Sequence, residues 1–339
     1  MSVTLIMLTF TVFLLAAVVL TTGAISLHGS SQLIRRRVPD APSDPAQYGL
    51  TYEEVAFPSR DGLTLRGWFI PASEARGTVV FCHGHAGSMD PDVQYTPAFH
   101  QRGYNVLMFD FRGHGRSEGQ YVSMGYYERQ DLLGAVDYLQ SRGIDQVGVL
   151  GFSMGGAVAM ATAPHSEAIR AVVSDGGFAR LSDAISAGMR GRGLPAFLAS
   201  LVGRFILWLM GLRLGCPLSE ADPIRWVDKI APRALFIIHG ALDPYVAVEE
   251  ARELYTAAGE PKEIWIVPEA GHRQADRRHP EEYRHRVLAF FDGSLGVCVV
   301  NVLESRTCSG SSRVTPNKLG SPIPRPREIP KSRKTENGG

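Results

Sequence analysis

The chain has 339 residues with 35 basic and 34 acidic side chains, a formal net charge of +1 and a 45% share of hydrophobic residues, which is ordinary for a globular protein. Without Arg35-Arg36-Arg37 and the basic C-terminal tail, the body is mildly acidic and has no basic stripe, which argues against nucleic acid as a partner. The four cysteines form neither a C-x-x-C pair nor a metal-ligand spacing, so they indicate no disulfide framework and no metal site.

The N-terminal stretch 3–27 has no charged residue and is long enough, as a helix, to cross a bilayer. A cluster of three arginines, Arg35 to Arg37, follows it. Because positive clusters tend to stay on the cytoplasmic side, the sequence predicts a single-pass membrane anchor with its N-terminus outside and a cytoplasmic body. The alternative is a secreted protein with a cleaved signal peptide, with Thr22-Gly23-Ala24 as the cleavage site, although the basic residues that usually open such a peptide are missing.

Residues 35–50 contain three prolines and are expected to form a linker, and the folded domain is expected over residues 51–292. Two strand-like runs, 53–59 and 63–70, flank a predicted hairpin turn at Arg60-Asp61-Gly62. Short apolar runs then alternate with helical patterns at 77–82, 95–102, 105–109 and 126–141. This alternation predicts an α/β fold with a mostly parallel sheet and helices on both faces.

The stretch Gly148-Val149-Leu150-Gly151-Phe152-Ser153-Met154-Gly155-Gly156 places a serine between a buried strand and a helix. Gly151-x-Ser153-x-Gly155 is the pattern of a nucleophile elbow, in which small residues on both sides of a strained serine let the strand and the helix approach closely. The first N–H groups of the helix, beginning with that of Met154, would point to where negative charge develops on an attacked carbonyl oxygen. The pattern also arises by chance in glycine-rich chains, and the flanking strand and helix are what favour a catalytic Ser153.

The alternation stops over residues 180–224, where no strand pattern occurs. Residues 194–212 form a strongly apolar helical stretch that is short for a second membrane span. We expect this insertion to form a helical lid over the carboxyl edge of the sheet and to line an acyl pocket. Ordinary core packing and shallow insertion into a membrane beside the anchor are the alternatives.

Strand and helix patterns resume at 234–238, 247–258, 263–267 and 280–291. The pattern ends near Gly293. The remaining segment, 293–339, is dominated by Ser, Pro, Gly, Lys and Arg in its last 30 or so residues and is expected to be a disordered tail.

A serine hydroxyl is a weak nucleophile unless a base takes its proton and a carboxylate orients that base. Asp243 and His272 each follow a buried strand, so in a parallel sheet both loops open on the edge that carries Ser153. The chain order Ser, Asp, His agrees with this architecture. Asp175 is a rival for the role of the acid, because it also follows a strand.

The turn His83-Gly84-His85-Ala86-Gly87 follows the strand at 77–82 and is suited to supply the second half of an oxyanion hole. Gly84 lets the backbone turn, so that the N–H of His85 can face the N–H of Met154 across a bound carbonyl oxygen. The two histidines have no third ligand nearby in the sequence, so we expect neither a metal nor another cofactor here.

Over residues 52–291 these motifs together resemble the α/β-hydrolase superfamily, and within it the branch of serine esterases, lysophospholipase-like proteins and serine-aminopeptidase-like hydrolases. Asp110-Phe111-Arg112-Gly113-His114-Gly115-Arg116-Ser117 is similar to the family's Asp-x-Arg-Gly-x-Gly-x-Ser loop, and His239-Gly240-x-x-Asp243-x-x-Val246 is similar to its acid loop. The epoxide-hydrolase and dehalogenase branches carry aspartate at the elbow, where this chain has Ser153. The resemblance implies the fold and the catalytic triad but says little about the substrate.

We therefore expect a membrane-anchored serine hydrolase that cleaves small-molecule acyl esters, lipid-like in character, through an acyl-enzyme formed on Ser153 with His272 and Asp243. A serine aminopeptidase or thioesterase of the same fold is one alternative. A non-catalytic, membrane-tethered binding protein is another. The sequence gives no indication of the oligomeric state.

Overall fold

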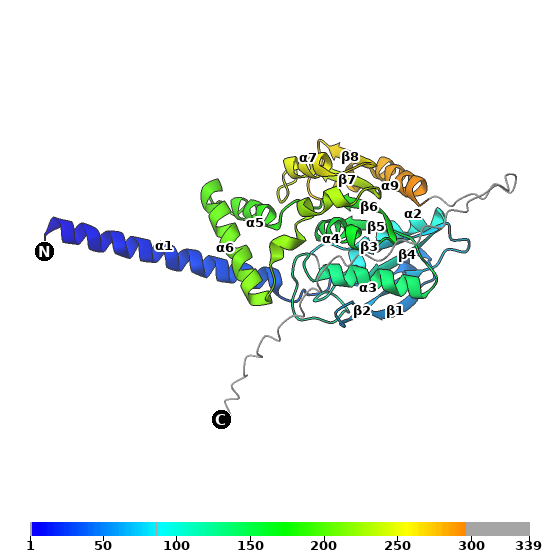
Figure 1. Ribbon diagram of the computed structural model, residues 1–339, viewed down its shortest axis with the longest axis horizontal. Helices are drawn as coiled ribbons and strands as arrows, with labels where there is room; N and C mark the ends of the chain where they lie inside the picture. Colours follow the sequence, from blue (N-terminus) through cyan, green and yellow to red (C-terminus); the bar gives the residue numbers. More distant parts are fainter. Residues whose placement is uncertain (1, 86, 296–339) are drawn as a thin grey trace, which may run out of the picture.

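One sheet of eight strands forms the centre of the computed structural model, which describes residues 2–85 and 87–295. The strand order is β1-β2-β4-β3-β5-β6-β7-β8 (Figure 1). The strands are Glu53–Pro58 (β1), Thr64–Ile70 (β2), Gly77–Cys82 (β3), Tyr104–Phe109 (β4), Val147–Phe152 (β5), Ile169–Asp175 (β6), Ala234–Gly240 (β7) and Lys262–Val267 (β8). The β1–β2 and β2–β4 pairs are antiparallel, and all pairs from β4 to β8 are parallel. The predicted fold class is confirmed.

Helices cover both faces of the sheet (Figure 1). The helices of the described residues are Val3–Ile34 (α1), Thr96–Gln101 (α2), Glu128–Ser141 (α3), Met154–Thr162 (α4), Leu181–Arg190 (α5), Ala196–Leu214 (α6), Val248–Ala257 (α7), Ala275–Arg278 (α8) and Pro280–Ser294 (α9). Helices α3, α4 and α7 contribute to the apolar core on one face, and α2 and α9 contribute to the core on the other face.

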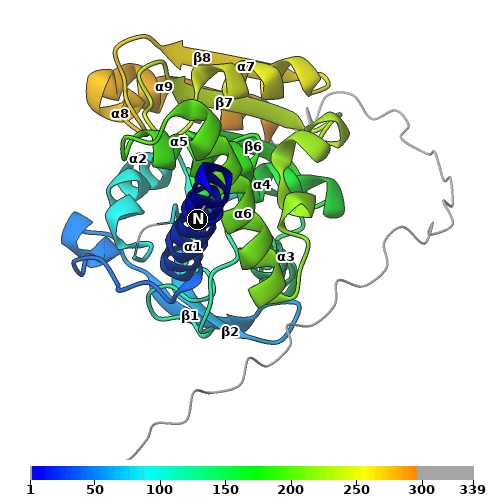
Figure 2. The ribbon, with the colours of Figure 1, turned by 90° about the vertical axis from the view of Figure 1, so that its left-hand side faces the viewer.

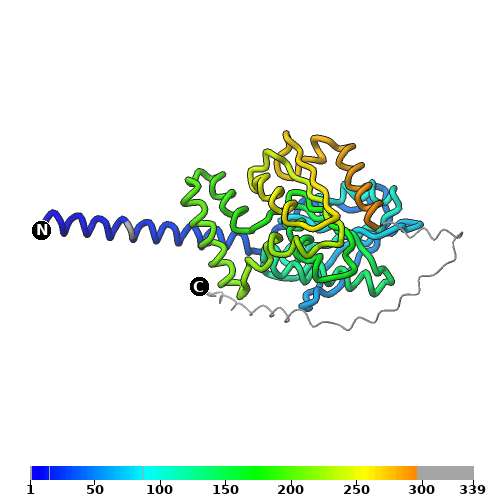
Figure 3. The backbone as a smooth tube through the Cα atoms, turned by 45° about the horizontal axis from the view of Figure 1, so that its top comes forward, coloured from blue at the N-terminus to red at the C-terminus, as the bar shows by residue number. Residues whose placement is uncertain are grey.

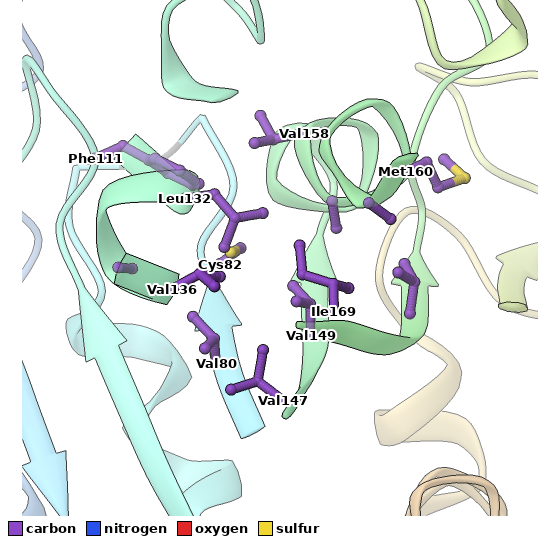
Figure 4. Packing of buried hydrophobic residues seen from close by; sticks show 14 of the residues in the cluster. Val80, Cys82, Phe111, Leu132, Val136, Val147, Val149, Val158, Met160 and Ile169 are labelled. Carbon is purple, nitrogen blue, oxygen red and sulfur yellow. The ribbon is translucent and has the colours of Figure 1, made fainter. Parts of the chain in front are cut away.

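The central strands are apolar at successive positions because each contributes side chains to two apolar cores, one on each face of the sheet. Val80 and Val149 belong to the core shared with α3 and α4, which Figure 4 shows from close by. Phe81 and Leu150, the next residues along the same strands, belong to the core shared with α2 and α9. Successive side chains of a strand point to opposite faces, so a strand buried on both sides has no polar positions to alternate with.

Helix α1 and the insertion lie at the same end of the molecule. The N-terminal part of α1 extends away from the body, and α5 and α6 stand beside the part of α1 that meets the body (Figures 1 and 3). A third apolar cluster joins these elements and includes Ile34 from α1, Ile185 from α5 and Ile206 from α6. The insertion is therefore built on the end of α1 as well as on the sheet.

The segment 35–50, expected to be a linker, is held against the body along its length. The Arg36 guanidinium donates to the carbonyl of Gly119 at 2.7 Å. The Asp40 carboxylate accepts hydrogen bonds from the backbone N–H groups of Gly87 and Ser88 at 2.8 and 2.9 Å. Composition identified a proline-rich spacer, but its charged side chains find partners in loops that are far away in the sequence.

Helix α9 extends to Ser294, so the first residues of the expected tail are helical. The rest of that prediction, from residue 296 onward, lies outside the described residues.

Candidate active site

Ser153 occupies a strained turn between β5 and α4. Its backbone has φ 52° and ψ −114°, a conformation that costs free energy for a residue with a side chain. A Cβ on Gly155 would lie 2.0 Å from the carbonyl oxygen of Cys82, and a Cβ on Gly151 would lie 2.4 Å from that of Gly155. The two glycines therefore permit strand β3, strand β5 and helix α4 to meet closely enough to present the serine, which is the local geometry that the G-x-S-x-G pattern predicts.

His272 joins Ser153 to Asp243, although the three residues come from three separate loops. The Ser153 hydroxyl donates to Nε2 of His272 at 2.9 Å, and Nδ1–H of His272 donates to Oδ2 of Asp243 at 2.6 Å. The imidazole is 20% exposed and the Asp243 side chain is fully buried. The structure thus brings together the three side chains that the sequence singles out.

The Asp243 carboxylate is held by its own loop. Its Oδ1 accepts hydrogen bonds from the backbone N–H groups of Tyr245 and Val246 at 2.8 and 3.0 Å. Burial by itself favours the neutral carboxyl, but the hydrogen bonds from His272 and from these two amides bring the pKa of Asp243 below its ordinary value. An ionised carboxylate at this point can fix the imidazole with its proton on Nδ1.

Asp175, the rival acid, has a different partner. Its carboxylate accepts a hydrogen bond from the Tyr283 hydroxyl at 3.0 Å, and burial raises its pKa to about 6. Its backbone carbonyl accepts the N–H of Ser153 at 2.8 Å. Asp175 therefore supports the elbow, and Asp243 is the carboxylate that contacts the imidazole.

The turn after β3 lies against the elbow. A Cβ on Gly84 would lie 3.3 Å from Cβ of Ser153. The backbone N–H of Phe111 donates to Nε2 of His83 at 2.9 Å, which leaves the proton of that ring on Nδ1, where it bonds the carbonyl of Gly84 at 2.6 Å. Burial lowers the pKa of His83 to about 4, so this ring is a neutral brace for the turn at pH 7.

The two amides expected to form an oxyanion hole belong to the turn after β3 and to the first residue of α4. Within the described residues, neither the N–H of His85 nor that of Met154 has a hydrogen-bond acceptor in the protein. The His85 ring lies against the end of α1, where its Nε2 donates to the carbonyl of Leu33 at 3.2 Å. Burial lowers the pKa of His85 to about 3, so its ring is neutral as well. Two amides without an acceptor in the protein are one condition for an oxyanion hole, and the assignment of His85 and Met154 to it stays a prediction.

No group of three His, Cys, Asp or Glu side chains within residues 2–85 and 87–295 could hold a metal ion. His83 and His85 bond backbone carbonyls instead.

Sequence reasoning missed Arg273, which follows His272 directly and has φ 51°. Its guanidinium donates to the buried carboxylate of Asp92 at 2.5 Å and lies 4.3 Å from the centre of the Phe152 ring. Burial opposes its charge, but the carboxylates of Asp92 and Asp175 raise its pKa above the ordinary value. Only its adjacency to His272 could have drawn attention to it, because Asp92 lies far away in the sequence.

The Asp-x-Arg-Gly loop that carries part of the family resemblance has a structural role. Oδ1 of the buried Asp110 accepts the N–H of Met89 at 2.7 Å. Arg112 is 3% exposed and bonds the carboxylates of Asp61 and Asp131, each at 2.6 Å. These contacts tie the loop after β4 to the hairpin and to α3, and none of them involves the triad.

Comparison with known proteins identifies relatives of this chain. Residues 73–223 match the family model described as serine aminopeptidase, S33. The uncharacterized protein YqkD of Bacillus subtilis is 30% identical over 249 residues, which cover 71% of this chain and 80% of YqkD. The α/β hydrolase domain-containing protein WAV2 of Arabidopsis thaliana is 32% identical over 232 residues, which cover 64% of this chain and 70% of WAV2.

Among solved structures, the esterase Pf2001 of Pyrococcus furiosus is 30% identical and superposes with a TM-score of 0.66, covering 77% of this chain and 99% of that one. On its fold and its relatives, this chain belongs to the α/β-hydrolase superfamily.

Proposed function

We propose that this protein is a serine hydrolase that cleaves carboxylic esters through an acyl-enzyme. The observation that carries the proposal is the hydrogen-bond chain from Ser153 through His272 to Asp243. Nucleophile and base lie within hydrogen-bond reach, and the base is oriented by an ionised carboxylate, which is the arrangement that acyl transfer by a serine needs.

In the first half of the reaction, Nε2 of His272 takes the hydroxyl proton as Oγ of Ser153 bonds to the ester carbonyl carbon. The carbonyl oxygen becomes negatively charged and accepts hydrogen bonds from the N–H groups of His85 and Met154, each of which contributes about 10² to 10³ in rate in comparable sites. The carbon–oxygen bond to the alcohol then breaks, and His272 returns its proton to the leaving alkoxide. Asp243 stays ionised and stabilises the imidazolium in both steps.

In the second half, a water molecule takes the place of the alcohol. His272 removes a proton from the water as its oxygen attacks the acyl-enzyme, and the same two N–H groups hold the new oxyanion. Collapse of this intermediate breaks the bond to Oγ, which regains its proton from His272. The carboxylic acid leaves, and the enzyme returns to its starting state without a cofactor.

The charge of the insertion favours an ester over the substrate of an aminopeptidase. An aminopeptidase has to hold the protonated α-amino group of its substrate, and a carboxylate close to the triad is the natural partner for it. Residues 184–219, which form most of the insertion, carry four arginines and no acidic residue. The similarity to the esterase Pf2001 supports the same choice.

We further propose that α1 is a retained membrane anchor. An 18-residue window of this helix has a mean hydropathy of 2.7 and no residue buried in the protein. A secreted form that lacks the helix is the alternative.

A fluorophosphonate probe, which reacts only with an activated serine, tests the catalytic proposal. We expect the wild-type protein to be labelled, Ser153→Ala to remain unlabelled, and Ser141→Ala to be labelled as the wild type is. Ser141 is the matched control because it is exposed and its hydroxyl, among the described residues, bonds only the carbonyl of Tyr138. A folded wild-type protein that takes up no label would indicate a binding protein instead.

The substrate class is tested by comparing p-nitrophenyl esters of increasing chain length with aminoacyl p-nitroanilides and with acyl thioesters. We expect the highest kcat/KM for an ester. A higher kcat/KM for every aminoacyl amide would replace the proposed activity by that of an aminopeptidase, and a higher value for thioesters would replace it by that of a thioesterase.

A further inference from the structure

Helix α6 presents a row of large apolar side chains to the outside of the molecule. Phe197, Leu201, Phe205, Trp208 and Leu212 are between 39% and 77% exposed. Their spacing of three or four residues places them on one face of the helix, which we name the α6 stripe. Five exposed side chains of this size in one row are unusual on a soluble surface and mark a site of interaction.

The opposite face of α6 is firmly attached to the protein. Val202, Ile206 and Met210 are at most 4% exposed and belong to the apolar cluster that α6 shares with α1 and α5. A Cβ on Gly203 would lie 2.5 Å from Oγ of Ser186, so α5 and α6 pack closely. A membrane-spanning position for α6 would break these contacts, and the helix therefore stays on the body with one apolar face outward.

The length of the exposed part of α1 determines where the α6 stripe lies relative to a bilayer. Among the side chains of this helix whose exposure is described, Ser26 is the first that is buried, and residues 3–25 ahead of it extend for about 35 Å at 1.5 Å per residue. This length crosses the hydrocarbon core of a bilayer, which is about 30 Å thick. The body therefore begins where α1 leaves the bilayer.

Helix α6 touches α1 immediately after this point. A Cβ on Gly29 would lie 2.9 Å from Cδ1 of Ile206, and the Arg213 guanidinium donates to the hydroxyls of Ser30 and Ser31 at 3.0 and 2.8 Å. Figures 1 and 2 show α6 running across α1. With α1 upright in a bilayer, α6 therefore crosses α1 close to the membrane surface.

The charged residues around the α6 stripe indicate which kind of surface the stripe can bind. Between Asp183 and Glu220 the chain has four charged residues, and all of them are arginines. Arg190, Arg192 and Arg204 are exposed. Trp208 stacks on Phe205 with ring centres 5.2 Å apart, and aromatic side chains gather at the boundary between lipid headgroups and acyl chains. An apolar face with basic residues around it is the pattern of a helix that lies in an anionic lipid surface.

The chain passes next to the triad just before it enters this insertion. A Cβ on Gly176, just after β6, would lie 3.3 Å from Cε1 of His272. The Tyr245 ring packs edge-on against the His272 ring at 5.3 Å, and Tyr245 and Leu242 are 56% and 66% exposed. Exposed apolar side chains are therefore found both at the triad and on the insertion that follows β6.

From these observations we propose that the α6 stripe lies in the surface of a phospholipid bilayer containing anionic lipids, at the point where α1 leaves that bilayer. The site would then receive acyl esters directly from the membrane in which the protein is anchored. This second part rests on the proposed esterase function, whereas the contact of α6 with lipid does not.

Tryptophan fluorescence tests the contact, because α1 contains no tryptophan and its own insertion gives no signal. The full chain is reconstituted in vesicles of phosphatidylglycerol and phosphatidylcholine with bromine on acyl carbons 6 and 7. We expect bromine to quench the emission of the wild-type protein and of Trp226→Phe, and to quench that of Trp208→Phe much less.

Trp226 is the matched control because it packs on His165, which follows the end of α4 that points away from the elbow. Equal quenching in the wild type and in Trp208→Phe would overturn the proposed contact. If the stripe instead joined two copies of the chain, bromine would leave Trp208 unquenched, and Leu201→Ser with Leu212→Ser would convert a detergent-solubilised dimer to a monomer.

Activity of the same Leu201→Ser, Leu212→Ser double variant tests the source of the substrate. We expect an unchanged rate on a soluble short-chain ester, and a rate at least about tenfold lower on a long-chain acyl ester embedded in the vesicles, because two apolar contacts with the lipid are lost. Wild-type rates on both substrates would overturn the membrane source. If the wild type cleaved no ester, the proposed function would fail, and the Trp208 measurement would still decide the lipid contact.

Discussion

Two buried carboxylates stand at the carboxyl edge of the sheet, and their partners separate their roles. Asp243 bonds Nδ1–H of His272, whereas Asp175 accepts the hydroxyl of Tyr283. Only the first can select the tautomer that leaves Nε2 free to accept a proton from Ser153. The second holds the strand end on which the elbow rests.

Asp243→Asn should therefore lower kcat for a soluble ester by about 10⁴-fold, because an amide in this place disfavours a proton on Nδ1. Asp175→Asn should cost far less, since the amide oxygen can still accept from Tyr283. Steady-state kinetics of both variants checks the assignment. A larger loss in Asp175→Asn would transfer the role of the acid to that residue.

The Arg273 guanidinium neutralises carboxylates beneath the active site. Arg273→Met should lower the free energy of unfolding by about 3 kcal/mol, because it leaves the buried Asp92 without its ion-pair partner. Urea unfolding of the purified protein measures this change. The double variant with Asp92→Asn should regain part of the loss, and an unchanged midpoint in Arg273→Met would contradict the proposed role.

At this scale, the sequence identified residues that share one sheet edge and missed those joined by packing. Ser153, Asp243 and His272 could be found because each follows a parallel strand, and such strands end at a common edge. Arg273 bonds Asp92, and Tyr283 bonds Asp175. These contacts depend on how the loops and helices pack, which no periodic pattern in the sequence encodes. The catalytic roles of the three residues stay predictions that the kinetic variants will test.

Among the elements, the β5–α4 turn depends on close contacts at Gly151 and Gly155, where there is no room for a side chain. A Cβ on Gly155 would lie 2.0 Å from a backbone oxygen of β3, which cannot move aside as a flexible side chain could. The strain of Ser153 is thus maintained by the packing of three elements.

Gly155→Ala should destabilise the protein by about 3 kcal/mol or more and abolish labelling of Ser153, because the helix has to shift away from β3. Gly293→Ala is the matched control, since a Cβ there meets nothing within 4 Å and the residue lies in helix α9. It should leave stability unchanged or raise it by about 0.5–1 kcal/mol. Thermal unfolding followed by circular dichroism distinguishes the two, and equal midpoints would refute the steric argument.

The positions of the strands could be predicted well because the central ones are short apolar runs, and β1 at the edge of the sheet alternates exposed and buried residues. The apolar stretch expected at 194–212 corresponds to α6 at Ala196–Leu214. The sequence does not predict helix α5 as a separate element. This helix lies inside the segment 180–224, whose only clear signal is the absence of a strand pattern. Its packing on α6 depends on Gly203, whose small size gives no signal in a hydropathy pattern.

For the molecule as a whole, the attachment to a membrane depends on whether α1 is kept. We expect the native protein to remain with the membrane fraction after extraction with alkaline carbonate, and its intact mass to include residues 1–34. Release into the supernatant together with a mass that begins near Ile25 would show that the helix is a cleaved signal sequence.

The sequence alone suggested that the membrane helix and the hydrolase were separate parts joined by a spacer, and the structure shows them interlocked. The carbonyl of Leu33 holds the ring of His85, and Arg36 holds the loop after β4. A truncated fragment that starts at Pro39 would therefore lose the support of the turn that carries His85, whose N–H we predict to be one of the two oxyanion donors. Inactivity of such a fragment would result from a collapsed turn and would say nothing about a need for lipid. A fragment that starts at Ile25 keeps the contacts of Leu33 and Arg36 with the body, and it is the form suited to crystallisation.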